Sequence, residues 1–206
     1  MGLLEKFLRS KVFIWVLLVL PGLWPAWPLL RQEPSVLADP AKYLLHHMGF
    51  VACVLLATVL TFTPLRVLFP KSKLALALNR HRRLVGVAAF AYALLHLGFH
   101  LIHEGGVATL AKDVKKPFIL SGLATFTILL ALAATSPHRV LRWMGAVKWK
   151  RLHRLVYLAA PLAAYHQAAA RKIFPVQVLW IFVPLAGLEA LRIWQQRKKT
   201  TAISTG

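Results

Sequence analysis

Histidine is the residue type that could do chemistry in this chain, which has nine histidines among 206 residues. Two of them, His96 and His166, lie deep inside long apolar runs, 12 residues after Leu84 and 13 residues after His153. At about 1.5 Å per helical residue, both imidazoles lie roughly 18–20 Å from the start of their helices. Two imidazoles at one depth on parallel helices can bind the iron of a haem from both axial sides. We therefore predict that His96 and His166 are the metal ligands of one haem.

Small residues flank both histidines and leave room for a flat macrocycle. Those at helical spacing from the two histidines are Ala89, Ala93, Ala159, Ala163 and Ala170. Small residues also let membrane helices approach each other, and a buried histidine can serve only as an interhelical hydrogen-bonding group. A haem-free scaffold or a small-molecule channel is therefore an alternative interpretation.

A third histidine, His153, precedes His166 by 13 residues and would lie about 20 Å away along a helix. That separation suits a second iron site. The two side chains would point some 140° apart on an ideal helix, although Pro161 between them can kink or rephase the turn. Geometry therefore leaves the ligation of His153 open, with His81 either its partner or an interface residue.

Two further histidines, His100 and His103, continue the helical stripe of His96. The pattern allows a histidine-box membrane metalloenzyme of the desaturase kind as a second alternative. Such an enzyme needs further histidine boxes at the same depth, and the chain offers only His46 and His47 for them. A solvated rim is the simpler interpretation of His100 and His103, and one of His46 and His47 could bond a haem propionate or serve as an alternative ligand.

Several other chemistries lack their residues. Cys53 is the only cysteine, which excludes a disulfide, a zinc cluster or an iron–sulfur site built from cysteines of this chain. The pair Gly105-Gly106 lacks the strand-to-helix context of a dinucleotide site, so electrons must come from another molecule. A cation path is also disfavoured because the six acidic residues lie at the ends of apolar runs or between them, at Glu5, Glu33, Asp39, Glu104, Asp113 and Glu189.

The elements that must position these residues are membrane helices. The chain is 58% hydrophobic and only 16% charged, which does not fit a soluble domain. Its apolar runs predict an all-α integral membrane protein, a bundle of six transmembrane helices at about 12–30, 43–65, 84–103, 117–137, 153–171 and 173–193. Residues 1–199 form one domain in this interpretation, and the polar tail 200–206 is disordered.

The net charge of +20 indicates topology rather than nucleic-acid binding, because the basic residues are not gathered on one domain with interleaved aromatics. Nineteen of the 26 Lys and Arg lie on the side of the membrane that holds both termini, which the positive-inside rule places in the cytoplasm. The other seven are Arg31, Lys42, Lys112, Lys115, Lys116, Arg171 and Lys172.

Several motifs over most of the chain resemble the MsrQ (YedZ) family, within the ferric-reductase-like transmembrane group. They are His46-x-x-Gly49, Arg82-Arg83-Leu84-x-Gly86, Leu94-Leu95-His96-Leu97, Trp149-x-x-Leu152-His153-Arg154-Leu155-Val156-Tyr157-Leu158 and the stripe of His166. The block around His153 is the most specific of these. Phe50 departs from the pattern, since relatives are expected to carry an arginine after the glycine of the second-span motif.

The resemblance implies a haem-binding membrane subunit of a bacterial periplasmic methionine sulfoxide reductase system. It implies haem b, an associated flavin (FMN), the inner membrane, and electron delivery to MsrP, a periplasmic molybdopterin enzyme that repairs oxidised methionine in proteins. The haem histidines of the family fall on His96, His153 and His166. We therefore expect an electron-transfer subunit without its own substrate site, reduced by a cytoplasmic flavoprotein or flavin reductase or by the quinol pool.

Overall fold

All regular secondary structure in the computed structural model is helical over the residues that it describes, namely residue 7 and residues 10–204, with side chains to residue 198. Lys6 and Arg9 of the basic N-terminal segment lie outside these residues. The helices are α2 (Lys11–Leu23), α3 (Ala26–Leu30), α4 (Pro34–Leu37), α5 (Pro40–Leu68), α6 (Lys73–Arg80), α7 (Arg82–Glu104), α8 (Val107–Asp113), α9 (Pro117–Ala134), α10 (His138–Met144), α11 (Ala146–His153), α12 (Val156–Ala169) and α13 (Gln177–Ser204). Helix α13 runs into the tail 200–206 that the sequence predicted to be disordered, and residues 205 and 206 lie outside the described part.

Four of the helices, α5, α7, α9 and α13, are long and apolar enough to cross a membrane. They confirm a membrane protein and correspond to four of the six predicted spans. The other two spans correspond to shorter helices: α2 has 13 residues and α12 has 14. At about 1.5 Å per residue, each covers roughly 20 Å of a hydrocarbon core that is about 30 Å thick.

Local sequence explains why these two helices are short. The first apolar run contains Pro21, Pro25 and Pro28, and the chain leaves α2 at Trp24 before a separate short helix, α3, begins at Ala26. Proline removes a backbone N–H and crowds the preceding turn, so a helix breaks most easily there. The predicted span 153–171 is interrupted as well, because a turn separates α11 from α12.

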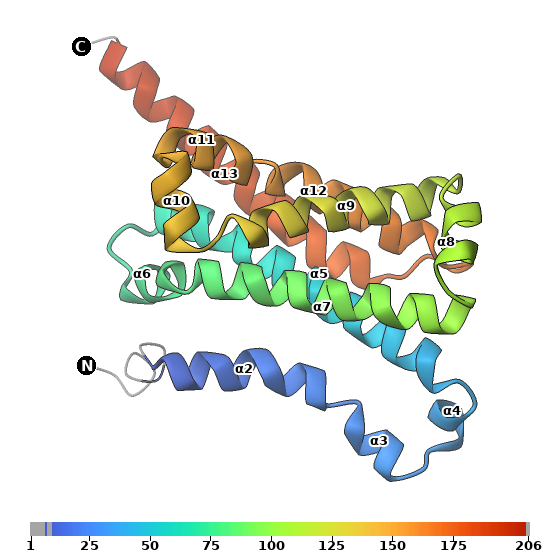
Figure 1. Cartoon of the computed structure of the whole chain (residues 1–206). Coiled ribbons are helices and arrows are strands. Elements are labelled where there is room, and N and C mark those ends of the chain that lie inside the picture. The colour runs from blue at the N-terminus through green and yellow to red at the C-terminus, as the bar shows by residue number, and fades with distance from the viewer. Residues whose placement is uncertain (1–6, 8–9, 205–206) are drawn as a thin grey trace.

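The long helices lie side by side in one bundle (Figure 1). Helix α5 packs along α7, α9 packs along α12, α13 packs on α5, and α7 also contacts α9. The short helices α6, α10 and α11 lie at one end of the bundle, where α2 begins and α13 ends. Helices α3, α4 and α8 lie at the opposite end, at the right of Figure 1.

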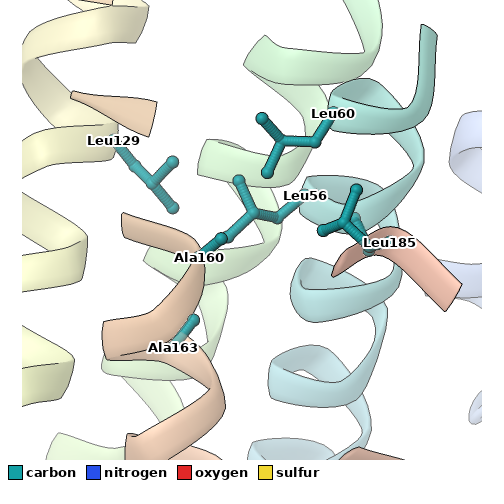
Figure 2. Packing of buried hydrophobic residues seen from close by; sticks show 7 residues of the cluster. Leu56, Leu60, Leu129, Ala160, Ala163 and Leu185 are labelled. Atoms are coloured by element: carbon teal, nitrogen blue, oxygen red, sulfur yellow. The ribbon is translucent and has the colours of Figure 1, made fainter. Parts of the chain in front are cut away.

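The centre of the bundle is a cluster of aliphatic side chains from α5, α9, α12 and α13 (Figure 2). Leu56 of α5 is only 1% exposed and lies between Leu60, Leu129, Ala160 and Leu185. Alanine on α12 lets this helix approach α5 closely, as small residues do at membrane helix interfaces. The cluster therefore fixes the spacing of the helices that carry the site described below.

Helix α2 is attached to the bundle by two side chains that donate to its backbone. The Tyr92 hydroxyl of α7 donates to the Leu18 carbonyl at 2.6 Å, and His47 Nε2 of α5 lies 2.7 Å from the Pro21 carbonyl. In a regular helix the Pro21 carbonyl would accept from residue 25, but Pro25 has no N–H. His47 therefore satisfies a carbonyl that the proline leaves without its helical donor.

Candidate functional site

The structure brings His96 of α7 and His166 of α12 together inside the bundle. Their ring centroids lie 5.9 Å apart, and the ring planes are nearly perpendicular at 86°. Two imidazoles that coordinate one metal ion from opposite sides, with bonds of about 2 Å, have ring centroids roughly 6 Å apart. The observed separation therefore fits a single ion between the two rings, as in the predicted haem site.

Each ring is oriented by a backbone carbonyl of a neighbouring helix. His96 Nδ1 lies 2.8 Å from the Leu45 carbonyl of α5, and His166 Nδ1 lies 2.7 Å from the Phe118 carbonyl of α9. Because a carbonyl only accepts, Nδ1 must carry the proton in both residues, and the neutral ring then has its lone pair on Nε2. A hydrogen bond from the second ring nitrogen is the usual outer-shell support of a metal-binding histidine.

A glycine lies against each histidine ring. A Cβ atom added to Gly49 of α5 would lie 2.6 Å from His96 Nδ1, and one added to Gly122 of α9 would lie 2.6 Å from His166 Nδ1. Both distances are shorter than any real contact of a Cβ atom. The two rings therefore occupy space that only glycine leaves open.

A cavity of about 430 Å³ lies between α5, α7, α9 and α12 and is lined by both histidines. Small residues from all four helices line it, namely Gly49, Ala52, Ala93, Gly122 and Ala163. Of the five alanines that the sequence singled out, Ala93, Ala163 and Ala170 line the cavity, whereas Ala89 and Ala159 are packed at 0% exposure and are not among its lining residues. The cavity is thus a mainly apolar space with two imidazoles inside it, as a flat macrocycle requires.

The mouth of this cavity is polar and carries basic side chains from three elements. Lys42 lies on α5, Lys116 lies just before α9, and Arg171 follows α12, so all three belong to one end of the bundle. Lys116 forms an ion pair with Asp113 at 2.9 Å. Glu104 and Asp113 line the same cavity, so Lys42 and Arg171 are the cations that carboxylate groups of a ligand would meet at this end.

Two of the remaining histidines near the cavity, His46 and His103, have other partners. His46 and His100 line the cavity, and His46 Nδ1 lies 2.7 Å from the Lys42 carbonyl of its own helix. His103 pairs with Asp39 at 3.2 Å at the mouth. Among the described residues, no group of three or more His, Cys, Asp or Glu side chains could hold a metal ion, so the histidine stripe of α7 forms no histidine box.

His153 lies apart from the paired histidines, at the end of α11. Its ring stacks on Trp149, with centroids 3.8 Å apart, and its Nε2 lies 3.2 Å from the Thr135 hydroxyl. That hydroxyl donates to the Ala131 carbonyl at 2.7 Å, so it accepts the proton of His153 Nε2. The turn before α12 also means that His153 and His166 do not share one continuous helix.

Sequence reasoning missed the groups that hold the two rings. Every residue has a backbone carbonyl, so the sequence does not indicate that those of Leu45 and Phe118 accept from the two rings. Gly122 was not singled out either. One signal was available: Gly49 and Gly122 each follow the accepting carbonyl by four residues, within an apolar run. The basic residues at the cavity mouth entered the sequence analysis only as topology markers.

Comparisons with known proteins identify the family of this chain. Residues 48–164 match the family described as ferric reductase like transmembrane component, which places the chain in that class of membrane proteins. The chain is 37% identical over 160 residues to the protein-methionine-sulfoxide reductase heme-binding subunit MsrQ of Polaromonas naphthalenivorans, covering 76% of this chain and 70% of the relative. It is 33% identical over 196 residues to the MsrQ subunit of Ralstonia nicotianae, covering 92% and 87%. The chain belongs to the MsrQ family. No solved structure matches it significantly.

Proposed function

We propose that the protein is a haem b-containing electron-transfer subunit of a methionine sulfoxide reductase system. The observation that carries the proposal is the pair His96 and His166, with ring centroids 5.9 Å apart and each Nδ1 donating to a carbonyl. Both Nε2 atoms are then available to one iron ion. The names of the two relatives, which are heme-binding subunits of such a system, support the same cofactor and the same role.

The residues of this chain bind and orient the cofactor. His96 and His166 would hold the haem iron through Nε2, and the Leu45 and Phe118 carbonyls set the direction of each ring. When bound, a haem would supply one-electron chemistry at this position. The lining alanines and glycines provide space for the macrocycle and exclude water from it.

The basic mouth of the cavity suits the propionates of a haem. Lys42 and Arg171 bring two cations to one end of the cavity, where Lys116 is paired with Asp113. Charge-assisted hydrogen bonds to carboxylates are stronger than neutral ones, so these side chains would fix the direction in which the macrocycle enters. We propose that the propionates point to this end of the bundle.

The topology and partners follow from charge and from the family. We propose six spans, with α2 and α12 as the short first and fifth spans, both termini in the cytoplasm, and the cavity mouth facing the periplasm. The electrons come from a cytoplasmic flavin reductase or flavoprotein, with FMN, or from the quinol pool. The protein passes these electrons to the molybdopterin enzyme MsrP. It is located in the bacterial inner membrane.

His153 is proposed as a third haem histidine because it falls on a haem histidine of the family. Its Nε2 would have to leave the Thr135 hydroxyl in order to bind a second iron. This part of the proposal has its own test. His153→Ala should lower the molar ratio of haem to protein while the bands assigned to the His96 and His166 haem persist; an unchanged ratio contradicts it.

Optical spectroscopy of the purified full chain tests the main proposal. The protein should show a Soret band and, when reduced, an α band. His96→Ala and His166→Ala should each remove most of the haem, whereas His138→Ala, at an exposed position on α10, should not. Far-ultraviolet circular dichroism controls for folding of each variant. Equal haem content in all three variants contradicts the assignment.

The same spectra decide the two alternatives. Protein that stays colourless when haem precursor is supplied would indicate a scaffold or channel in which the histidines only join helices. Non-haem iron without a Soret band would indicate the histidine-box enzyme. A haem that is reduced by a flavin reductase and reoxidised by MsrP would support the proposed place in the electron path.

A further inference from the structure

We infer that Gly49 and Gly122 are positioning residues of the histidine pair. Each glycine exposes the backbone carbonyl four residues before it, so that the ligand histidine of the neighbouring helix can donate to that carbonyl through Nδ1. The inference rests on the proposed haem site. Both glycines line the cavity, and the inference gives them a second role, in which they act on the iron through His96 and His166.

The same arrangement occurs twice in the bundle. On α5 the carbonyl of Leu45 accepts from His96 of α7 at 2.8 Å, and Gly49 lies under the ring. On α9 the carbonyl of Phe118 accepts from His166 of α12 at 2.7 Å, and Gly122 lies under that ring. Both glycines follow their carbonyl by four residues, and a Cβ added to either one would lie 2.6 Å from Nδ1 of the ring above it.

Helix geometry explains why the fourth residue matters. The Cα–Cβ bonds of a helix tilt toward its N-terminus, so a side chain covers the turn before its own Cα. The carbonyl of residue i already accepts from the N–H of residue i+4, and a Cβ at i+4 lies beside its remaining lone pair. Glycine at i+4 therefore opens this carbonyl to a ring from another helix.

An alanine at either position forces the ring to move. Real Cβ atoms essentially never show contacts under 3.0 Å, and ordinary contacts begin at 3.4 Å, so from 2.6 Å the ring must move away by about 0.4 to 0.8 Å. Helix α5 cannot retreat easily, because Leu56 and Leu60 fix it in the aliphatic core. We expect the imidazole ring to rotate away from the carbonyl instead. This rotation breaks the Nδ1 hydrogen bond that fixes the tautomer of the ring and the direction of Nε2.

The consequence is measurable at the iron. Loss of an outer-shell partner of a metal-binding histidine typically lowers affinity or activity about 10–100-fold. The carbonyl also makes the ligand more basic, which favours ferric over ferrous iron. Gly49→Ala and Gly122→Ala should therefore weaken haem binding about 10–100-fold, raise the reduction potential, and change the EPR spectrum of ferric haem, which depends on the angle between the imidazole planes.

Two other glycines provide matched controls. A Cβ at Gly86 would lie 4.0 Å from Val59, an ordinary contact, so Gly86→Ala tests the loss of a helix glycine alone. A Cβ at Gly22 would lie 2.7 Å from the Tyr92 hydroxyl, so Gly22→Ala tests a steric clash with a ring outside the histidine pair. Both controls should bind haem with the affinity and EPR spectrum of the unmodified protein.

The experiment is a haem titration of the four full-length variants in detergent, with EPR and potentiometry of those that bind. Unchanged affinity, spectrum and potential in Gly49→Ala and Gly122→Ala overturn the inference, and the haem site still stands if His96→Ala abolishes binding. Absence of haem from the unmodified protein overturns the proposed function instead. If both glycine variants fail to fold, NMR of ¹⁵N-histidine in the reduced, unmodified protein decides: Nδ1–H groups that are hydrogen-bonded in both ligands support the inference, and Nδ1–H groups without a hydrogen bond refute it.

Discussion

The hydrogen bond from His47 to the Pro21 carbonyl predicts a specific coupling between a histidine and a proline on different helices. Pro25 removes the N–H that would normally satisfy this carbonyl, and His47 Nε2 satisfies it at 2.7 Å. The substitution His47→Phe keeps an aromatic ring beside Tyr43, whose ring lies 6.4 Å away, and removes the donor. The substitution Pro25→Ala restores the missing backbone N–H.

The expected magnitude follows from the environment of the bond. A buried acceptor left without a partner costs about 1–3 kcal/mol, whereas interhelical hydrogen bonds measured in a membrane average about 0.6 and reach about 1.7 kcal/mol. This bond is only partly buried. We therefore expect His47→Phe to lower the free energy of unfolding by about 1 kcal/mol.

Unfolding of the purified chain in mixed micelles, followed by circular dichroism, measures this free energy for both single variants and the double variant. In the Pro25→Ala background, the backbone N–H takes over the carbonyl, so the cost of His47→Phe should fall close to zero. The cycle cancels the cavity that Pro25→Ala leaves, because both backgrounds contain it. Equal costs of His47→Phe in the two backgrounds would refute the reasoning, and loss of haem in His47→Phe would make this residue a ligand.

Three other predictions follow from the packing and the site. Leu56→Ala should lower the free energy of unfolding by about 2–5 kcal/mol, since Leu56 is 1% exposed in the core, while Leu120→Ala, at 57% exposure, should have a far smaller effect in the same assay. Trp149→Phe should lower the free energy of unfolding by about 0.5–1.5 kcal/mol, because the indole N–H donates to the Thr135 carbonyl at 2.9 Å. An unchanged free energy of unfolding would show that this bond contributes nothing. Haem removal should lower the thermal midpoint of the unmodified protein, because a ligand that binds only the folded state stabilises it; this difference should disappear in His96→Ala, and its persistence there would argue against ligation by His96.

The general architecture could be predicted from the sequence because hydrophobic length is a strong signal. The runs that became α5, α7, α9 and α13 are long and apolar, and all four are confirmed as helices of spanning length. The equal depth of His96 and His166 followed from counting residues along two such runs. Counting failed where the chain interrupts a run: prolines end α2 early, and a turn separates α11 from α12.

The finer parts of the site could not be predicted, because they consist of backbone carbonyls and of glycines that lack a Cβ atom. The carbonyls of Leu45 and Phe118 are acceptors that every residue type possesses. Gly122 acts through the Cβ that it lacks, and its role depends on which neighbouring helix supplies a ring. Such features require the relative positions of α5, α7, α9 and α12, which no local pattern specifies.

Two histidines of this bundle contact backbone carbonyls through different ring nitrogens, one in a structural role and one in the ligand role proposed above. His47 and His96 both satisfy a carbonyl of another helix, the first where Pro25 removes a donor and the second where Gly49 removes a Cβ. His47 uses Nε2 for its carbonyl, so this nitrogen would have to leave the Pro21 carbonyl before it could bind a metal. His96 uses Nδ1, and its Nε2 remains available inside the cavity. Residue type and depth alone do not distinguish the two cases, whereas the nitrogen that meets the carbonyl does.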